Sequence, residues 1–200
     1  MRFAPTSFRP AFGRVLSVVV VLIAATGVAG FVVGGDAEGV LRYGWGLLLL
    51  CALAIALFWM PRLSIAEHEV TVRNVFSTVH VPWLAIQRID TKWALTVYTD
   101  GLTIPVWASP APSRYASQVS DTTDARLAAS AGGASPRPGD LLSTGSGAAA
   151  YLIRRHWDDL RADGVLDSGA EPGSVRRDIH WTTIIVVGIL AVATVLGFLL

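Results

Sequence analysis

The chain has 200 residues, of which 52% are hydrophobic and only 16% are charged, and its mean hydropathy is +0.52. Soluble domains carry about 25% charged residues, so this balance is typical of a membrane protein and excludes an ordinary soluble domain. The net charge is +1 and Lys92 is the one lysine, so no lysine-rich tract is available for a nucleic-acid partner. The single cysteine, Cys51, excludes an internal disulfide and a cysteine-based zinc cluster.

Three hydrophobic runs predict transmembrane helices, at residues 15–34, 43–60 and 181–200. None of them contains Asp, Glu, Lys, Arg or His, and each is close to the roughly 20 residues that cross a hydrocarbon core as a helix. A cleaved signal peptide is the alternative for the first run, because residues 1–14 are basic. The run is longer than the usual apolar core of a signal peptide, which favours a retained anchor.

The arginines predict the orientation of these helices. The residues that flank the runs on one side are Arg2, Arg9, Arg14, Arg62, Arg73, Arg176 and Arg177, whereas the connection between the first two runs holds Asp36 and Glu38 against Arg42. Basic residues favour the cytoplasmic side of a membrane. We therefore expect a multi-pass protein of the plasma membrane whose residues 1–14 and middle segment are cytoplasmic.

Residues 61–108 have the alternating pattern of half-buried strands. Trp93, Leu95 and Val97 alternate with small or polar residues, and the same period of two recurs before and after them. Asp100-Gly101 predicts a tight hairpin. About six short strands joined by short turns favour a small antiparallel β-barrel.

The rest of the middle segment changes character twice. Residues 109–147 are rich in Ser, Ala, Gly and Pro, which predicts a flexible linker. Residues 148–163 place apolar side chains on one helical face and charges on the other, so we expect an amphipathic helix that caps the open end of the barrel. Residues 164–180 form a second linker before the third run.

Four stretches of this segment carry a family resemblance. They are "PRLSI", "EVTVRN", "VHVPWLAIQRI" and "DGLTIPVWA". Together they resemble the bacterial PH-like domain of actinobacterial membrane proteins, of the low-molecular-weight antigen 6 type, and residues 148–163 are similar to the helix that caps PH-like barrels. The resemblance gives Pro82, Trp83 and Ile86 a structural role: Pro82 ends a strand, and the two apolar side chains plug the core.

No pattern in the sequence predicts catalysis. The four histidines lie in different kinds of segment, and the adjacent Asp158 and Asp159 point to different sides of a helix. No nucleophile elbow or phosphate-binding loop occurs, and the three runs lack the ionisable groups of proton relays. Gly30-x-x-x-Gly34 suits either close helix packing or a turn. We expect no enzymatic activity, no cofactor and no metal site.

The sequence thus predicts an α+β membrane protein with three transmembrane helices and one small antiparallel PH-like β-barrel with a C-terminal capping helix. PH-like domains similar to this one are non-catalytic modules, so the expected function is that of a membrane-anchored scaffold for unidentified proteins. The alternative is an accessory subunit of a membrane transport or envelope-assembly complex. The candidate contacts for partners or anionic lipid headgroups are Arg73, Arg88, Lys92 and Trp93.

Overall fold

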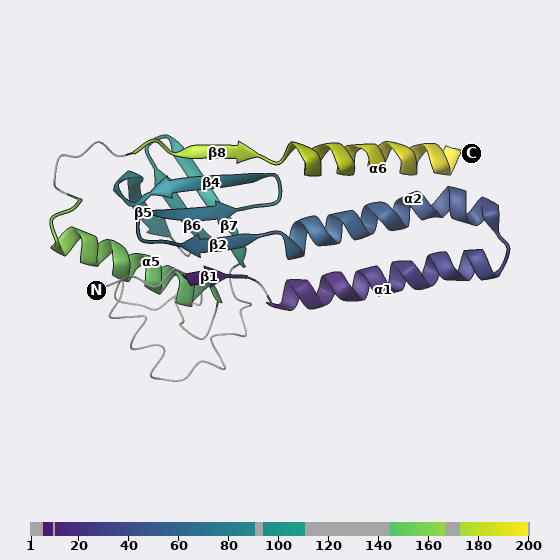
Figure 1. Cartoon of the computed structure of the whole chain (residues 1–200), viewed down its shortest axis with the longest axis horizontal. Coiled ribbons are helices and arrows are strands. Elements are labelled where there is room, and N and C mark those ends of the chain that lie inside the picture. The colour runs from purple at the N-terminus through teal and green to yellow at the C-terminus, as the bar shows by residue number, and fades with distance from the viewer. Residues whose placement is uncertain (1–5, 10, 91–93, 111–144, 167–172, 200) are drawn as a thin grey trace. The chain divides into compact units, whose positions relative to one another are not determined.

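The structure is a computed structural model that describes residues 6–9, 11–90, 94–110, 145–166 and 173–199. The chain divides into two compact units. One unit comprises Met1–Arg9, Arg62–Asn74 and Thr78–Asp178, and the other comprises Pro10–Pro61, Val75–Ser77 and Ile179–Leu200. The first unit holds nearly all of the β-structure and one helix, whereas the second holds three long apolar helices (Figure 1).

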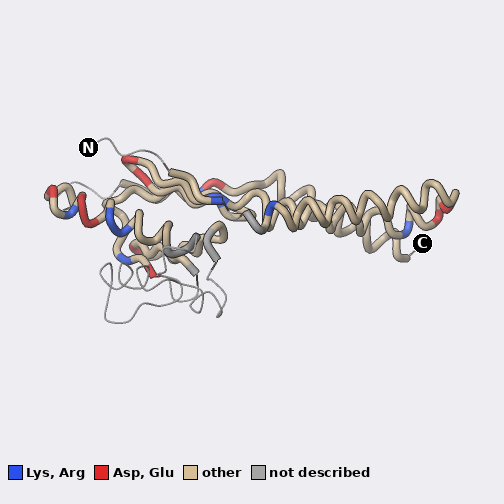
Figure 2. Tube along the Cα trace, turned by 90° about the horizontal axis from the view of Figure 1, so that it is seen from below, with Lys and Arg blue, Asp and Glu red and all other residues tan. Residues whose placement is uncertain are grey.

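The apolar helices form at the three predicted runs. They are α1 (Ala11–Val33), α2 (Ala37–Ala54), which continues into the π-helical turn η1 (Ile55–Trp59), and α6 (Trp181–Leu199). All three are long and apolar enough to cross a membrane. Charged residues are few along these helices: Arg14 lies near the start of α1, and acidic and basic residues, Asp36, Glu38 and Arg42, lie at the turn between α1 and α2 and just after it (Figure 2). The prediction of three apolar helices is confirmed.

Within this unit α2 contacts both other helices. The turn from α1 to α2 uses Gly35 at φ +68°, and the carboxylate of Asp36 accepts a hydrogen bond from Gly39 N at 2.7 Å, which caps α2. Helix α6 approaches α2 so closely at Gly197 that an added Cβ would lie 2.9 Å from the carbonyl oxygen of Leu41. An added Cβ on Gly30 would meet nothing within 4 Å, and Gly30 O instead accepts from Gly34 N, which supports the turn alternative for that pair.

One antiparallel sheet has five strands, in the order β1-β2-β3-β4-β8. Their bounds are Thr6–Phe8 for β1, Arg62–Ile65 for β2, Glu69–Arg73 for β3, Ser77–Pro82 for β4 and Arg176–Ile179 for β8. The register pairs Phe8 with Leu63, Leu63 with Val72, and Val72 with Val79. These apolar side chains therefore stack across neighbouring strands on one face of the sheet.

The other sheet has three strands, β5 (Ile86–Asp90), β6 (Ala94–Thr99) and β7 (Leu102–Pro110). Gly101, at φ +76°, makes the predicted hairpin between β6 and β7. The register shifts once in each pair of strands, and Pro105 lies on β7 at the edge of the sheet, where its missing N–H interrupts no ladder.

Both sheets contribute to one hydrophobic core, and helix α5 (Gly145–Ala162) completes it. Ala149, Ala150 and Ile153 of α5 are almost fully buried in this core, and the helix contacts β5, β6 and β7. The amphipathic helix predicted at residues 148–163 thus packs on the sheets of its own chain.

The expected closed barrel is wrong, because the strands form two open sheets. Between β4 and β5 the chain makes a 3-10 turn, η2 (Trp83–Ala85), instead of continuing a ladder. On the other side, a side chain links the sheets: Asn74 Nδ2 donates to Pro105 O at 2.8 Å, and Asn74 Oδ1 accepts from Trp107 N at 3.1 Å. The amide of Asn74 thus makes the pair of hydrogen bonds to β7 that the backbone of a neighbouring strand would otherwise make.

Two strands of the five-stranded sheet come from outside residues 61–108. Strand β1 lies in the predicted N-terminal tail and β8 in the predicted second linker. Strands β1, β2 and β8 each join an apolar helix with no more than two residues between. Most of the linker predicted at 109–147 lies outside the described residues.

Candidate interaction surface

The face of the five-stranded sheet that points away from the core carries polar side chains, and we call it the outer face. Its residues on β2, β3 and β4, all partly exposed, are Arg62, Ser64, Glu69, Thr71, Arg73, Thr78 and His80. They alternate with buried apolar residues such as Leu63 and Val72, because successive side chains of a strand point to opposite faces. The strand pattern therefore places seven polar side chains on one surface.

Side chains of β3, β4 and β8 form the His80 cluster on this sheet, which comprises Glu69, Thr71, His80, Arg176 and Asp178. The Nδ1 atom of His80 lies 2.8 Å from Glu69 Oε1, and its Nε2 atom lies 3.6 Å from Asp178 Oδ2. The Thr71 hydroxyl donates to Glu69 at 3.1 Å, and an Arg176 amino group lies 3.2 Å from Asp178. The cluster thus ties the exposed edge strand β8 to β4 and β3 through side chains.

The pKa of Glu69 is lowered from its ordinary value by these contacts. The hydrogen bond with His80 is the largest cause, the hydrogen bond from Thr71 and the positive charges of His80 and Arg176 act in the same direction, and partial burial opposes them. Glu69 consequently remains a carboxylate at lower pH than an ordinary glutamate.

The His80 cluster does not have the geometry of a metal site. The two carboxylates contact opposite nitrogens of the His80 ring, so they cannot share one ion with it. Among the described residues no group of three or more His, Cys, Asp or Glu side chains is placed to hold a metal. The hydroxyl of Thr71 donates to Glu69, so that proton is directed to a carboxylate and not to the imidazole.

One end of the outer face is basic. Arg62 and Arg73 are direct partners across β2 and β3, and Arg9 follows Phe8, the residue paired with Leu63. We call Arg9, Arg62 and Arg73 the arginine row. The arginines therefore lie at one end of β2 and β3, whereas Glu69 lies at the other end of β3.

The predicted contact residues are distributed over different parts of the domain. Arg73 lies in the arginine row, whereas Arg88 lies on β5 with its guanidinium carbon 4.1 Å from the centre of the Tyr98 ring. Lys92 and Trp93 fall outside the described residues. The structure thus places Arg73 and Arg88 on different sheets, and sequence reasoning did not single out Arg9 and Arg62 as a site because their alignment with Arg73 depends on strand register.

The residues of the predicted structural motif lie where β4 passes into β5. Pro82 is the last residue of β4, Trp83 opens η2 and Ile86 opens β5. Trp83 and Ile86 are only 3% and 4% exposed and belong to the core. The indole N–H of Trp83 donates to Ala66 O at 3.0 Å, and its ring meets that of His156 of α5 edge to face, with centroids 4.7 Å apart.

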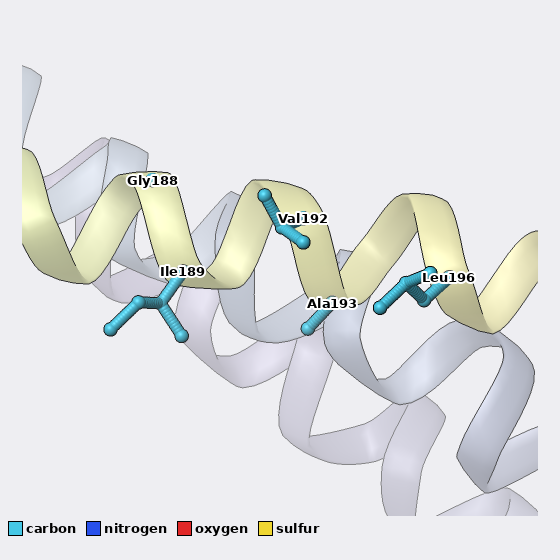
Figure 3. Close-up of a pocket in the computed structure, with 5 residues that line it drawn as sticks. All are labelled: Gly188, Ile189, Val192, Ala193 and Leu196. Atoms are coloured by element: carbon cyan, nitrogen blue, oxygen red, sulfur yellow. The ribbon is translucent and has the colours of Figure 1, made fainter.

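A shallow apolar hollow lies on α6, within the helical unit. Gly188, Ile189, Val192, Ala193 and Leu196 line it (Figure 3). The lining offers almost no polar surface. Such a surface suits hydrocarbon chains in general and contains no group that would orient a specific ligand.

Comparison with known proteins supports the assignment of the β-rich unit. The family model of the bacterial PH domain matches residues 60–156, which include β2 to β7 and most of α5. No curated protein and no solved structure matches the chain. The matched segment thus contributes strands to two antiparallel sheets, which share one core that a helix closes. Residues 60–156 of this chain are a bacterial PH domain.

Proposed function

We propose that the protein is a non-catalytic, membrane-anchored scaffold whose PH domain presents the outer face to other molecules at the cytoplasmic side of the plasma membrane. The observation that carries the proposal is the direct continuation of β1, β2 and β8 into three helices that are long and apolar enough to span a bilayer. A domain joined to a membrane at three points is retained beside it, so its exposed side chains are available for recruitment.

The outer face supports this role because its polar side chains are partly exposed and do not surround a reaction centre. The arginine row gives it a basic end, which favours partners that present acidic groups there. Arg88, stacked on Tyr98, offers a second basic contact on the other sheet. Lys92 and Trp93 remain candidates by sequence.

The orientation is part of the same proposal and rests on the arginines. Arg9, Arg14, Arg62 and Arg177 stand near the helix ends that join the strands, whereas Asp36 and Glu38 stand at the turn between α1 and α2. Fusion of alkaline phosphatase after Gly164, in an exposed turn, is expected to give an inactive enzyme. An active fusion would show that the PH domain lies on the opposite side of the membrane and would contradict the proposed orientation.

Photo-crosslinking in intact cells tests the scaffold function. A crosslinking amino acid at Ser64, on the outer face, is expected to capture specific proteins, identified by mass spectrometry. The matched position is Ile189, which is 62% exposed on α6. Capture of the same proteins from Ile189 and none from Ser64 would instead favour the accessory-subunit function, in which the helices make the essential contacts.

A further inference from the structure

His80 contacts a carboxylate through each of its two ring nitrogens. Its Nδ1 atom lies 2.8 Å from Glu69 Oε1 on β3, and its Nε2 atom lies 3.6 Å from Asp178 Oδ2 on β8. All three residues belong to the same compact unit. The ring thus stands between the body of the five-stranded sheet and its edge strand, so the charge of the ring affects how β8 is held.

A protonated ring is the form that fits both contacts. An imidazolium carries an N–H on each nitrogen, whereas a neutral imidazole has one N–H and one lone pair. With its proton on Nδ1, the neutral ring donates to Glu69 and turns a lone pair toward Asp178. With its proton on Nε2, it turns the lone pair toward Glu69 instead. Loss of one ring proton therefore replaces an attraction by a repulsion.

The neighbours of His80 on β3 do not supply the missing proton. The Thr71 hydroxyl lies 3.4 Å from Nδ1, but its single proton is donated to Glu69 at 3.1 Å. Arg73, the next residue on this face of β3, is the Cα partner of Thr78 and not of His80. On this side the ring therefore faces one carboxylate and no cation.

The neighbours on β8 leave the same need for a charged ring. Arg176 lies 3.2 Å from Asp178 and is its ion-pair partner, whereas Arg177 points to the other face of the strand. The two carboxylates of the cluster thus share one arginine, and their charge is balanced when His80 is charged. The lowered pKa of Glu69, for which the hydrogen bond with His80 is the largest cause, agrees with an attractive contact.

Strand β8 depends on such side-chain contacts because little of it is buried. All four of its residues, Arg176–Ile179, are exposed, whereas buried and partly buried residues alternate along β4. The apolar residue just before it, Val175, packs against the core and is itself only partly buried. Segments with few buried apolar contacts open with a low free energy. A change in one side-chain contact is therefore expected to alter how often β8 opens.

We propose that His80 is a pH-sensitive latch, which holds β8 on β4 while the ring is protonated and loosens it when the ring is neutral. Histidine rings change charge between about pH 5 and pH 8. The contacts are complete at the acidic end of this range, and one of them is lost as the pH rises through it. Opening of β8 bares the edge of β4, where backbone groups can pair with another strand. The latch goes beyond the proposed scaffold function and does not depend on it.

Hydrogen exchange of the full-length protein, read by mass spectrometry, tests the latch. Protection of β8 amides is measured between about pH 5.5 and pH 8 and corrected for the intrinsic exchange rate at each pH. Carboxyl groups ordinarily titrate near about pH 4, so the range isolates the imidazole. Asp178 is 51% exposed, and exposed pairs contribute little, so protection should fall about two- to fivefold as the pH rises. Protection of β8 that does not change with pH would overturn the proposal.

The decisive variant is His80→Gln, and the matched control is His180→Gln, at the histidine that directly follows β8. Glutamine stays neutral, so His80→Gln should remove the pH dependence of β8 protection. Asp178→Asn should also remove it, because a neutral amide faces the ring in both charge states. His180→Gln should retain it. Dependence lost in His180→Gln and kept in His80→Gln would assign the titration to His180 and sink the latch.

A permanently charged residue separates the latch from a purely structural role. His80→Arg keeps a positive charge over the whole range, so β8 should stay protected at every pH, as in the wild type at the acidic end. This variant also gives a result if His80→Gln does not fold. Equal losses of protection in the Gln and Arg variants would show that the shape of the imidazole, and not its charge, holds β8.

Discussion

The two sheets of the PH domain differ in how far apart their strands lie in the sequence. The three-stranded sheet consists of consecutive strands, β5 to β7, and α5 packs on it. The five-stranded sheet takes β1 from before the first apolar helix and β8 from just before the third. Its outer face also carries charged side chains that have no role in the core. Core packing between segments close in sequence thus accounts for the three-stranded sheet. The five-stranded sheet also depends on strands from distant parts of the sequence, and it carries charged side chains outside the core.

The contact of α5 with the three-stranded sheet should give the largest effect on stability. Ile153 is fully buried in the core, and Ile153→Ala should lower the free energy of opening by about 2–5 kcal/mol. Hydrogen exchange of β6 amides in the full-length protein measures this. Arg155→Ala, on the exposed side of the same helix, is the control and should leave the exchange unchanged.

The hydrogen bond of Trp83, which lies at the junction between the two sheets, should have a smaller effect on stability. Trp83→Phe keeps an aromatic ring in the core but removes the hydrogen bond to Ala66 O. The loss should be about 1–2 kcal/mol, because one carbonyl is left without its donor. Thermal unfolding followed by circular dichroism measures it, with Trp107→Phe, at a position 53% exposed, as the matched change. Equal midpoints for the two variants would contradict the assigned role of the indole N–H.

The amide of Asn74 joins the two sheets on their other side and should contribute less, since it is partly exposed. Asn74→Ala removes both hydrogen bonds to β7 and should cost about 1 kcal/mol. Asn74→Asp keeps the acceptor for Trp107 N and loses only the donor to Pro105 O. Protection of β7 amides should therefore fall in the order wild type, Asp, Ala, and any other order would argue against this link.

The smallest expected effect lies in the His80 cluster on the outer face. The folded protein lowers the pKa of Glu69 below its value in the unfolded chain, so this carboxylate adds stability above the unfolded pKa, and that stability is lost as the pH falls through the folded pKa. Its side chain is 39% exposed, so solvent reduces the effect.

Thermal midpoints measured between about pH 6 and pH 3 test this linkage. Over that range the wild type should lose stability more steeply than Glu69→Gln, whose side chain has no proton to bind. Glu67→Gln, in the exposed turn before β3, should follow the wild type. Parallel curves for wild type and Glu69→Gln would show that the carboxylate does not contribute to the acid dependence.

Local patterns in the sequence predict the parts of the fold that depend on near neighbours. The period of two marks the strands from β2 to β7, Asp100-Gly101 marks their hairpin, and the apolar face of residues 148–163 marks α5. Local patterns do not predict that the two sheets stay open. Their closure depends on whether the first and last strands of a meander find each other, and here β7 instead bonds to the side chain of Asn74, which directly follows β3.

Strands β1 and β8 show a second limit of local patterns. Each has only three or four residues with polar neighbours, so neither has an alternation long enough to recognise. Their pairing depends on β2 and β4, which lie far away in the chain. The arginine row was missed for the same reason: Arg73 was a candidate by its type and position, but its alignment with Arg9 and Arg62 exists only once the register is known.

The pairing of β1 with β2 constrains how the protein is inserted during synthesis. These strands flank the hairpin of α1 and α2, and a ladder between them requires both to be on the same side of the bilayer. The hairpin must therefore cross twice or not at all, and a chain in which one of the two helices failed to insert would leave the edge of β2 bare. A chain that lacked α1 and the residues before it would also lack β1, the partner that covers this edge of β2.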